Sequence, residues 1–413
     1  MKSFPIVILG GGVVAGYAAK EFVAQSGKKG DLAIVTVENV LPYERPPLSK
    51  SFLAGKEKVG DIQISNAAFY RKNGIAIYRN FLVGKVDVRR HRLHGSSGEL
   101  IGFEKLLIAT GSTVRRLTVP GANRSEVFYL RQMKDSQAIQ AQIKRGKRAV
   151  VIGSGFIGME VASVLASRGV ETTMVFPDDR VWKHLFTPSV STFFESQFAG
   201  HGITFMKKEK VVALIHKNRE WQVILGSGNK VLTDFVVAGI GVIPAVELFH
   251  RTPLDTHDGI KVNEFLETSV PGIWAAGDIA NYPDQIFHSR RRVEHWDNAV
   301  EQGRVAMRNM MDKLQPFIHV PYFFSDVFDL SYEFWGDAGG HDQVVYRGHM
   351  NKKQLSVWWL KKQTLCAALI MNRPEEERRC APRWIMQRPR LDPKALQHAR
   401  NLTLLDTTFG RQE

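Results

Sequence analysis

Two glycine-rich stretches, VILGGGVVAG at residues 7–16 and VVIGSGFIGME at residues 150–160, decide the fold of this chain. In each, an apolar run typical of a buried parallel strand meets glycines and continues into a helical pattern. Backbone N–H groups at the start of such a helix, together with the positive end of its dipole, can bind a pyrophosphate. The two copies therefore predict two dinucleotide-binding domains.

The two copies differ at one position. The second has the full G-x-G-x-x-G spacing, whereas the first has alanine in the third place, where only a small side chain is needed between helix and strand. The positions are Gly10, Gly12 and Ala15 in the first copy and Gly153, Gly155 and Gly158 in the second.

An acidic residue follows each glycine motif at about the expected distance of ~20 residues. Glu38 ends a predicted strand at residues 32–37, and Asp178 follows a predicted strand at residues 172–176. A carboxylate in this place accepts hydrogen bonds from ribose hydroxyls. We therefore expect NADH rather than NADPH at the second site, although Arg180 nearby leaves NADPH possible.

The length of 413 residues exceeds what one compact core supports and indicates several domains. Apolar strands at residues 106–112 and 236–244 mark predicted crossings between the first and second domains. We predict an α/β protein with two Rossmann-like, three-layer nucleotide-binding domains and a small α+β C-terminal domain. The predicted boundaries are 1–114 with 246–319, then 115–245, then 320–413.

The composition, 44% hydrophobic and 23% charged, is that of a globular protein. No secretory signal is recognisable, and the longest apolar stretch, residues 235–249, is too short and too interrupted to span a membrane. The cysteines, Cys366 and Cys380, lie near the C-terminus, so no redox-active pair follows the first glycine motif. We expect a cytoplasmic protein without a membrane span and without a metal site.

The formal net charge is +15. Such a charge speeds association with acidic partners and anionic substrates. The basic residues are scattered in short clusters, which also fits ordinary solvated faces, and no nucleic-acid-binding motif is present. We expect no specific nucleic-acid partner.

Several further motifs follow in a recognisable order. They are PYERPPLSK at 42–50, ATGS at 109–112, MVFPDDR at 174–180, LFTPSV at 185–190, AAGDIA at 275–280, RRVEHWDNA at 291–299 and PYFFSDVFDLSYEFWGD at 321–337. With the two glycine motifs, this set resembles the FAD-dependent pyridine nucleotide reductases of the ferredoxin reductase type, and within them the monodehydroascorbate reductases. The resemblance spans nearly the whole chain.

The resemblance implies FAD at the first motif and NAD(P)H at the second. The FAD-binding residues it implies are Gly10, Gly12, Ala15, Glu38, Arg45, Ala109, Thr110, Gly111, Gly277 and Asp278. Those implied for the nicotinamide nucleotide are Gly153, Gly155, Phe156, Ile157, Gly158, Asp178 and Gly241. Lys50, Glu294, His295 and Trp296 are implied around the flavin ring.

The resemblance also implies catalytic roles for Lys50, Glu160 and Trp296. An ammonium beside the flavin stabilises negative charge on the reduced ring, and a carboxylate holds that ammonium in place. Trp296 offers an aromatic face to the ring. Without the resemblance, a surface lysine is the favoured interpretation of Lys50, and a helix residue packed in an interface explains Trp296 equally well.

Three positions depart from the monodehydroascorbate reductase pattern. Val300 stands in place of the arginine that contacts the ascorbyl radical, Phe324 in place of a substrate-side tyrosine, and Phe156 in place of the tyrosine that shields the nicotinamide. A valine offers neither charge nor hydrogen bonds to an oxygen-rich anion. Arg291, Arg292 or His295 could compensate.

The predicted function is hydride transfer from NAD(P)H to FAD, followed by single-electron transfer to an acceptor. That acceptor is a small acidic protein, such as a ferredoxin or rubredoxin, or monodehydroascorbate. The alternative is a redox-sensing flavoprotein similar to apoptosis-inducing factor, which binds partners through an NADH charge-transfer complex. The sequence leaves monomer and homodimer open.

Overall fold

The computed structural model describes residues 1–124, 126–218 and 220–406. Backbone contacts divide the chain into two units. The first comprises Met1–Pro47, Glu57–Thr113 and Val242–His319, and the second comprises Leu48–Lys56, Val114–Gly241 and Val320–Glu413. Within the described ranges, every helix is too short or too polar to cross a membrane. The three predicted domain boundaries stay a prediction, and the end of the third lies outside the described residues.

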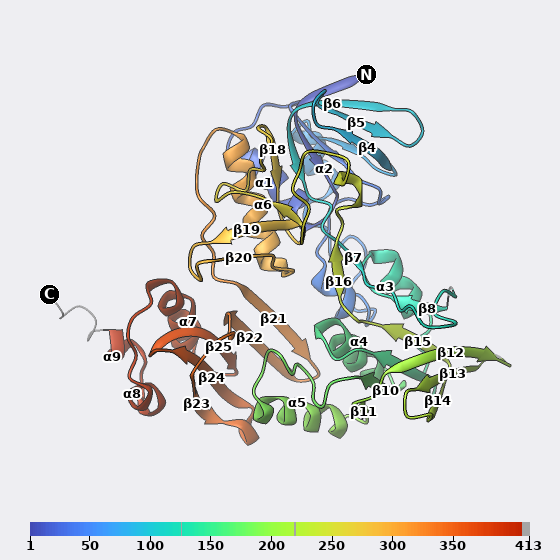
Figure 1. Ribbon diagram of the computed structural model, residues 1–413, viewed down its shortest axis with the longest axis vertical. Coiled ribbons are helices and arrows are strands. Elements are labelled where there is room, and N and C mark those ends of the chain that lie inside the picture. Colours follow the sequence, from blue (N-terminus) through green and yellow to red (C-terminus); the bar gives the residue numbers. More distant parts are fainter. Residues whose placement is uncertain (125, 219, 407–413) are drawn as a thin grey trace. The chain divides into compact units, whose positions relative to one another are not determined.

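The first unit is built on a seven-stranded sheet in the order β3-β2-β1-β6-β5-β4, with β18 also paired to β6 (Figure 1). Strands β1, β2, β3, β6 and β18 are parallel, and their carboxyl ends align because Leu9 pairs with Val35 and Ile108, and Ile108 pairs with Ala275. The bounds are β1 Lys2–Leu9, β2 Leu32–Val35, β3 Ala76–Tyr78, β4 Val83–Asp87, β5 Arg92–Gly95, β6 Leu100–Ile108 and β18 Ile273–Ala275.

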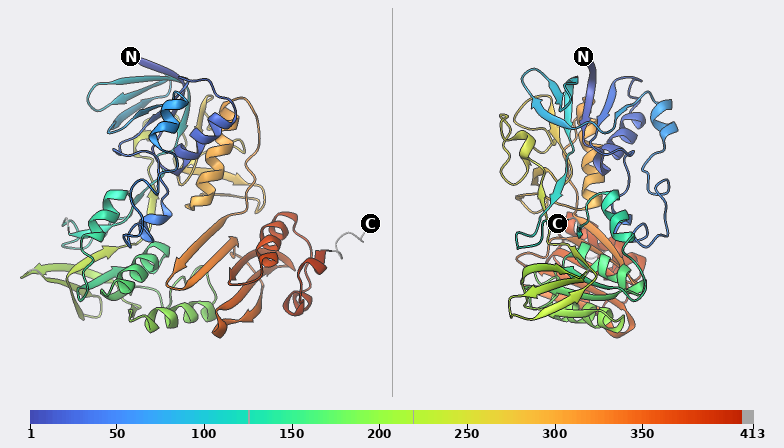
Figure 2. Two further views of the ribbon diagram at one scale, coloured as in Figure 1. Left: turned by 180° about the vertical axis from the view of Figure 1, so that it is seen from behind. Right: turned by 90° about the vertical axis from the view of Figure 1, so that its right-hand side faces the viewer.

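Helices α1 (Val13–Ala24) and α6 (Trp296–Met310) pack closely in this unit (Figure 2). A glycine permits the approach, because a Cβ at Gly303 would lie 2.9 Å from the carbonyl oxygen of Val14. The contact brings the α6 sequence next to the first glycine motif. Further elements are α2 Ala67–Lys72, β16 Val242–Pro244, β17 Ile260–Lys261, β19 Ala280–Asp284 and β20 Ser289–Arg291, and β7 Ser112–Val114, at the end of the Glu57–Thr113 segment, pairs with β16.

The second unit contains another parallel sheet, in the order β11-β10-β9-β15-β8. Ile152 at the end of β9 pairs with Val175 and Ala238, so the carboxyl ends align here too. The elements are β8 Val127–Tyr129, α3 Met133–Gln140, β9 Arg148–Ile152, α4 Phe156–Ser167, β10 Glu171–Phe176, α5 Pro188–Gly200, β11 Thr204–Lys207 and β15 Phe235–Ala238. An antiparallel sheet of β12 Val211–Lys217, β13 Glu220–Leu225 and β14 Lys230–Thr233 is inserted before β15.

The C-terminal part of the second unit is an antiparallel sheet in the order β21-β22-β25-β24-β23, with α7 packed on it (Figure 2). Aromatic rings from the segment between β10 and α5 pack against this sheet. The ring centroids of Trp182 and Tyr332 are 6.1 Å apart, and those of Phe186 and Phe334 are 5.9 Å apart. The elements are β21 Tyr322–Val327, β22 Leu330–Gly336, β23 Gln343–His349, β24 Gln354–Lys361, β25 Thr364–Met371, α7 Glu375–Gln387, α8 Pro393–His398 and α9 Thr403–Asp406.

The predicted fold class is confirmed: two nucleotide-binding α/β sheets are followed by a small α+β region. One predicted strand end is wrong, because β2 ends at Val35 rather than at residue 37. The apolar pattern overran this end because the chain stays apolar where it leaves the sheet, and Val37 is 54% exposed. β6 and β15 end at Ile108 and Ala238, just before the glycines expected to end them.

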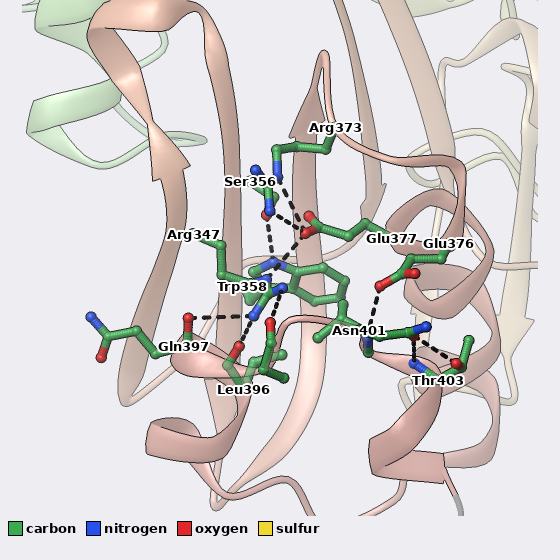
Figure 3. A network of polar contacts seen from close by, with 12 residues as sticks. Arg347, Ser356, Trp358, Arg373, Glu376, Glu377, Leu396, Gln397, Asn401 and Thr403 are labelled. Carbon is green, nitrogen blue, oxygen red and sulfur yellow. Dashed lines mark hydrogen bonds and ion pairs between the residues drawn. The ribbon is translucent and has the colours of Figure 1, made fainter.

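The basic segment after β25 caps the C-terminal sheet through a buried ionic network (Figure 3). Glu377, which is 1% exposed, accepts hydrogen bonds from Arg347 and Arg373 through Oε1. The Arg347 guanidinium also binds the carbonyl oxygens of Leu396 and Ala399 at the end of α8. Arg347 therefore ties α8 to β23 and α7, and the arginine-rich segment closes its own domain.

We expect Arg347→Met to destabilise the second unit by about 3–5 kcal/mol, because it leaves buried Glu377 with one guanidinium instead of two and removes the donors to α8. Urea unfolding measures this loss. The control is Arg379→Met, which breaks the exposed ion pair with Glu375 at 2.6 Å and should cost less than about 1 kcal/mol. Equal losses in the two variants would contradict a clamping role for Arg347.

Candidate functional site

The first glycine motif forms a tight turn between β1 and α1. Gly10 has φ +130°, and a Cβ on it would lie 2.1 Å from the carbonyl oxygen of Ala109. Gly12 caps α1 without any side-chain hydrogen bond, and Ala15 is fully buried. The first turn of α1 thus has backbone N–H groups that no capping side chain binds, and no acidic residue lies in it. An uncapped helix end of this kind suits an anion, and it fits the FAD pyrophosphate.

Glu38 lies three residues beyond β2, held by two donors. Its Oε1 accepts from Arg45 Nη2 at 2.7 Å and its Oε2 from Tyr43 Oη at 2.7 Å. Arg45 also donates to Tyr43 Oη at 2.6 Å. The structure therefore brings two predicted FAD-binding residues together, with Tyr43 as a third member that the sequence analysis missed. A carboxylate fixed in this way fits the adenosine ribose of FAD.

The predicted motifs at residues 109–111 and 277–278 meet at the carboxyl ends of β6 and β18. Thr110 Oγ1 donates to the carbonyl oxygen of Ala245 at 3.2 Å, and Gly111 has φ +68°. Asp278 accepts from Ser112 Oγ at 2.7 Å. Gly277, with φ +82°, donates its N–H to Oε1 of buried Gln302 at 2.7 Å. The sequence analysis missed Gln302, which lies on α6.

Trp296 begins α6 and is held by a carboxylate of the 42–50 motif. Its Nε1 donates to Glu44 Oε2 at 2.5 Å, and Tyr17 Oη donates to Glu44 Oε1 at 2.8 Å. Burial makes the largest contribution to the raised pKa of Tyr17, and the Glu44 carboxylate raises this pKa further. Glu44 thus accepts a hydrogen bond from the indole through one oxygen and from Tyr17 on α1 through the other. The sequence analysis missed Glu44.

The neighbours of Trp296 on the chain are also fixed by the first unit. Glu294 forms an ion pair with Arg292. Burial lowers the pKa of His295 to about 4, and the carboxylates of Asp278 and Asp297 oppose this shift. His295 is therefore neutral at neutral pH, and it cannot supply a positive charge to an anionic substrate.

The second glycine motif repeats the geometry of the first. A Cβ on Gly153, with φ +110°, would lie 2.2 Å from the carbonyl oxygen of Gly239, and one on Gly158 would lie 2.5 Å from that of Gly153. Gly155 caps α4 without a side-chain hydrogen bond, and a Cβ on it would meet no atom within 4 Å. Gly241, with φ +100°, is equally open. The space beside Gly155 and Gly241 suits a second dinucleotide.

Two side chains follow Gly155 at the start of α4. Phe156 packs against Phe323, with ring centroids 4.3 Å apart, and against Trp182 at 5.7 Å. Ile157 is 42% exposed. Aromatic rings therefore support Phe156 at the start of α4. A side chain in this place could cover a nicotinamide.

Asp178 lies two residues beyond β10. Among the described residues, the basic group that lies within ion-pair distance of it is the His184 imidazole, with Nε2 3.9 Å from Asp178 Oδ1. Asp179, in contrast, pairs through Oδ1 with Arg180 and Lys183, both at 3.3 Å. Asp178 is thus available to ribose hydroxyls. Arg180 is the side chain that the sequence suggested for the 2′-phosphate of NADPH, and it already pairs with Asp179.

Lys50 and Glu160 form an ion pair within the second unit. Lys50 Nζ lies 3.3 Å from Glu160 Oε1 and 4.5 Å from the centroid of the Phe324 ring. The two side chains are 13% and 8% exposed. Lys50 is therefore no ordinary surface lysine, and its pairing with Glu160 agrees with the partnership that the sequence predicted.

The basic residues suggested as substitutes for the missing arginine are engaged. Arg291 pairs with Asp284 at 2.9 Å, and Arg292 pairs with Asp258 at 3.0 Å as well as with Glu294. Val300 is 3% exposed on α6. Arg291 and Arg292 are thus each already held in an ion pair, whereas the neighbouring Arg290 donates to the neutral acceptors Asn281 and Val262.

We expect Gly155→Ala to weaken NADH binding about tenfold or more while the protein folds normally, because the added methyl group meets no protein atom but fills the space beside the uncapped end of α4. Equilibrium titration of the protein with NADH measures the change. Gly200→Ala is the control: it also adds a methyl group into open space without a positive φ, at the end of α5 and far along the chain from the motif. Unchanged NADH affinity in Gly155→Ala would contradict the assignment of this site.

We expect His295→Asn to flatten the acid side of the stability profile. A folded pKa of about 4 against an unfolded pKa of ~6.5 means that the unfolded chain binds the extra proton first, so stability is full above pH ~6.5 and falls as the pH drops toward 4. The linkage amounts to about 2 kcal/mol at pH 5. Urea unfolding at pH 7 and pH 5 tests it, and an unchanged pH dependence in the variant would refute it.

Two family models match most of the chain. A family model described as pyridine nucleotide-disulphide oxidoreductase matches residues 4–303, and one described as reductase C-terminal matches residues 322–403. The monodehydroascorbate reductase of Pisum sativum is 33% identical, covering 95% of this chain and 96% of its own length.

Solved structures show the same similarity. A ferredoxin reductase from Rhodopseudomonas palustris aligns with a TM-score of 0.87 at 30% identity, covering 92% of this chain and 93% of its own. Putidaredoxin reductase, in its covalent complex with putidaredoxin, aligns with a TM-score of 0.93 at 27% identity, covering 100% and 99%. The resemblance inferred from the motifs is confirmed.

Proposed function

Because this chain belongs to the pyridine nucleotide-disulphide oxidoreductase family, we propose that it transfers electrons from NADH, through FAD, to a small acidic electron-transfer protein. The chain is an FAD-dependent NAD(P)H oxidoreductase. When bound, FAD would supply the capacity to accept a hydride and to release two electrons singly. The acceptor, the preference for NADH and the residue roles are the proposed part.

In this proposal each unit holds one dinucleotide. Gly10, Gly12 and the start of α1 bind the FAD pyrophosphate, while Glu38 and Asp278 bind its hydroxyl-bearing parts. The start of α4 binds the NADH pyrophosphate, and Asp178 binds its ribose. Lys50 would offer a positive charge to the flavin, and Glu160 would hold that charge in position. Trp296, fixed by Glu44, would offer it an aromatic face.

A cysteine relay plays no part in the proposed mechanism, although disulphide reduction is part of the family description. Cys366 and Cys380 are the only cysteines of the sequence. Both are buried in the C-terminal sheet and α7, and burial raises the pKa of the Cys366 thiol. Electrons therefore leave directly from the flavin to the acceptor.

Asp178 supports NADH as the donor. A 2′-phosphate beside this carboxylate would meet like charge, and Arg180 is paired with Asp179 at 3.3 Å. The free 2′-hydroxyl of NADH would instead donate to Asp178. A kcat/KM for NADPH equal to that for NADH would contradict this preference.

The observation that favours a protein acceptor is the engagement of the arginines near α6. Arg291 and Arg292 are occupied by Asp284, Asp258 and Glu294, and Val300 is buried. A small anionic radical would therefore compete with carboxylates for both of these arginines, whereas a macromolecular acceptor responds to the whole field of a chain with a net charge of +15. Monodehydroascorbate is the second candidate, favoured by the 33% identity to the Pisum sativum enzyme.

We expect NADH oxidation with an acidic ferredoxin or rubredoxin to lose about tenfold or more in kcat/KM between low and moderately high salt, because screening weakens electrostatic steering. Steady-state assays over a salt series, with enzymatically generated monodehydroascorbate as the comparison, measure this. Rapid turnover of monodehydroascorbate with slow turnover of both proteins would select the second candidate. Negligible turnover of every acceptor, with a persistent NADH charge-transfer band, would favour the redox-sensing alternative.

The subcellular location and the oligomeric state stay predictions from sequence. A cytoplasmic location fits the two buried cysteines, since reducing compartments keep thiols unpaired. Both a monomer and a homodimer agree with the proposed function.

A further inference from the structure

The carboxylate of Glu160 is surrounded by donors from two other segments of the second unit, residues 48–56 and strand β21. It lies on α4 and is 6% exposed. Its Oε2 accepts from Ser49 Oγ at 2.5 Å, and its Oε1 accepts from Ser325 Oγ at 2.6 Å. Lys50 Nζ lies 3.3 Å from Oε1. The two hydroxyls are therefore closer to the carboxylate than the ammonium is.

The two serines are as buried as the acid that they bind. Ser49 is 2% exposed and Ser325 is 1% exposed. A hydroxyl donates a directed hydrogen bond without neutralising the charge of the carboxylate. One donor on each oxygen fixes the plane of the carboxylate, so the direction from which it attracts Lys50 is fixed as well.

Strand β21 contacts both members of the ion pair. Ser325 binds Glu160, and the ring of the preceding residue, Phe324, lies 4.5 Å from Lys50 Nζ. The C-terminal sheet therefore supplies neighbours to the acid and to the base, although neither of these belongs to it. Ser49, by contrast, precedes Lys50 directly and would accompany it in any case.

We propose that Ser325 is a positioning residue that orients the Glu160 carboxylate and, through it, the Lys50 ammonium, so that strand β21 contributes to the placement of the lysine. The inference rests on the proposed function, in which Lys50 acts at the flavin. Ser325 itself touches neither nucleotide in this account. Its effect on the reaction passes through Glu160.

The test uses the FAD-loaded protein and compares Ser325→Ala with Ser325→Thr, which keeps the hydroxyl. Removing this hydroxyl lets the carboxylate rotate, and a displaced reacting group commonly costs about 10- to 100-fold in rate. We expect flavin reduction by NADH, followed by stopped-flow absorbance, to slow at least about tenfold in the alanine variant. We expect the threonine variant to retain most of the rate, and the NADH Kd and FAD content to stay unchanged in both.

A matched control is Ser356→Ala. Ser356 is fully buried in the same C-terminal sheet, and its hydroxyl accepts a hydrogen bond from Trp358 Nε1 at 2.9 Å (Figure 3). This variant also loses a buried serine hydrogen bond, but it leaves Glu160 alone. We expect normal flavin reduction from it even if its thermal stability falls.

A double-mutant cycle separates positioning from general structure. If Ser325 acts through Glu160, then Ser325→Ala has no further effect on flavin reduction in a Glu160→Ala background. A structural role would instead give additive losses. If the alanine variant at 325 proves unstable, Ser325→Cys, which keeps a weak donor of similar size, provides the same comparison and should lie between serine and alanine.

A second readout does not depend on turnover. The rate at which an acylating reagent modifies Lys50, read by mass spectrometry without NADH, should rise several-fold in Ser325→Ala and stay unchanged in Ser356→Ala. Wild-type rates of flavin reduction and of Lys50 modification in Ser325→Ala would overturn the proposal. So would additive losses in the cycle.

Failure of the underlying function gives a different pattern. If Lys50→Met and Glu160→Ala both reduce flavin as fast as the wild type, then the ion pair has no part in hydride transfer and the proposed function is wrong at this point. If these two variants are slow while Ser325→Ala is normal, only the positioning role is refuted.

Discussion

The constraint on which both nucleotide sites depend is the close approach of two backbones at the end of a parallel strand. At Gly10 and again at Gly153, the chain turns with positive φ directly beneath a carbonyl oxygen of the neighbouring strand segment, leaving about 2 Å where a Cβ would be. Any other residue would push the turn away from the sheet. The turn directs the start of the following helix to the carboxyl ends of the strands, where nucleotides bind in such sheets.

Charge in this protein is divided between internal and external roles. Arg291 and Arg292 form ion pairs with carboxylates of their own unit. Arg347 forms an ion pair with Glu377 and a hydrogen bond to the end of α8. These pairs fix loops and helix ends. An arginine held in such a pair is not available to bind a substrate. The proposed acceptor is therefore one that is recognised by the overall electric field of the protein rather than by a single guanidinium.

The sequence predicted well those features that depend on local geometry. The glycine turns, the strands that precede them and the acids at 38 and 178 follow from residue types within about 30 positions of one another. Glu44, Gln302 and Ser325 could not be found in this way. Trp296 and Glu44 are 252 residues apart, and Ser325 and Glu160 are 165 apart, so only the tertiary fold brings their polar atoms together. The hairpin of β4 and β5 likewise carries weak apolar alternation, and no element was predicted there.

The central claim is that one chain binds two dinucleotides and passes a hydride between them. Anaerobic titration of the FAD-loaded protein with NADH, followed by flavin absorbance, tests this claim most directly. The account predicts full reduction of the flavin by one equivalent of NADH per chain. A purified protein that takes up no FAD, or one whose bound flavin stays oxidised in excess NADH, would contradict it.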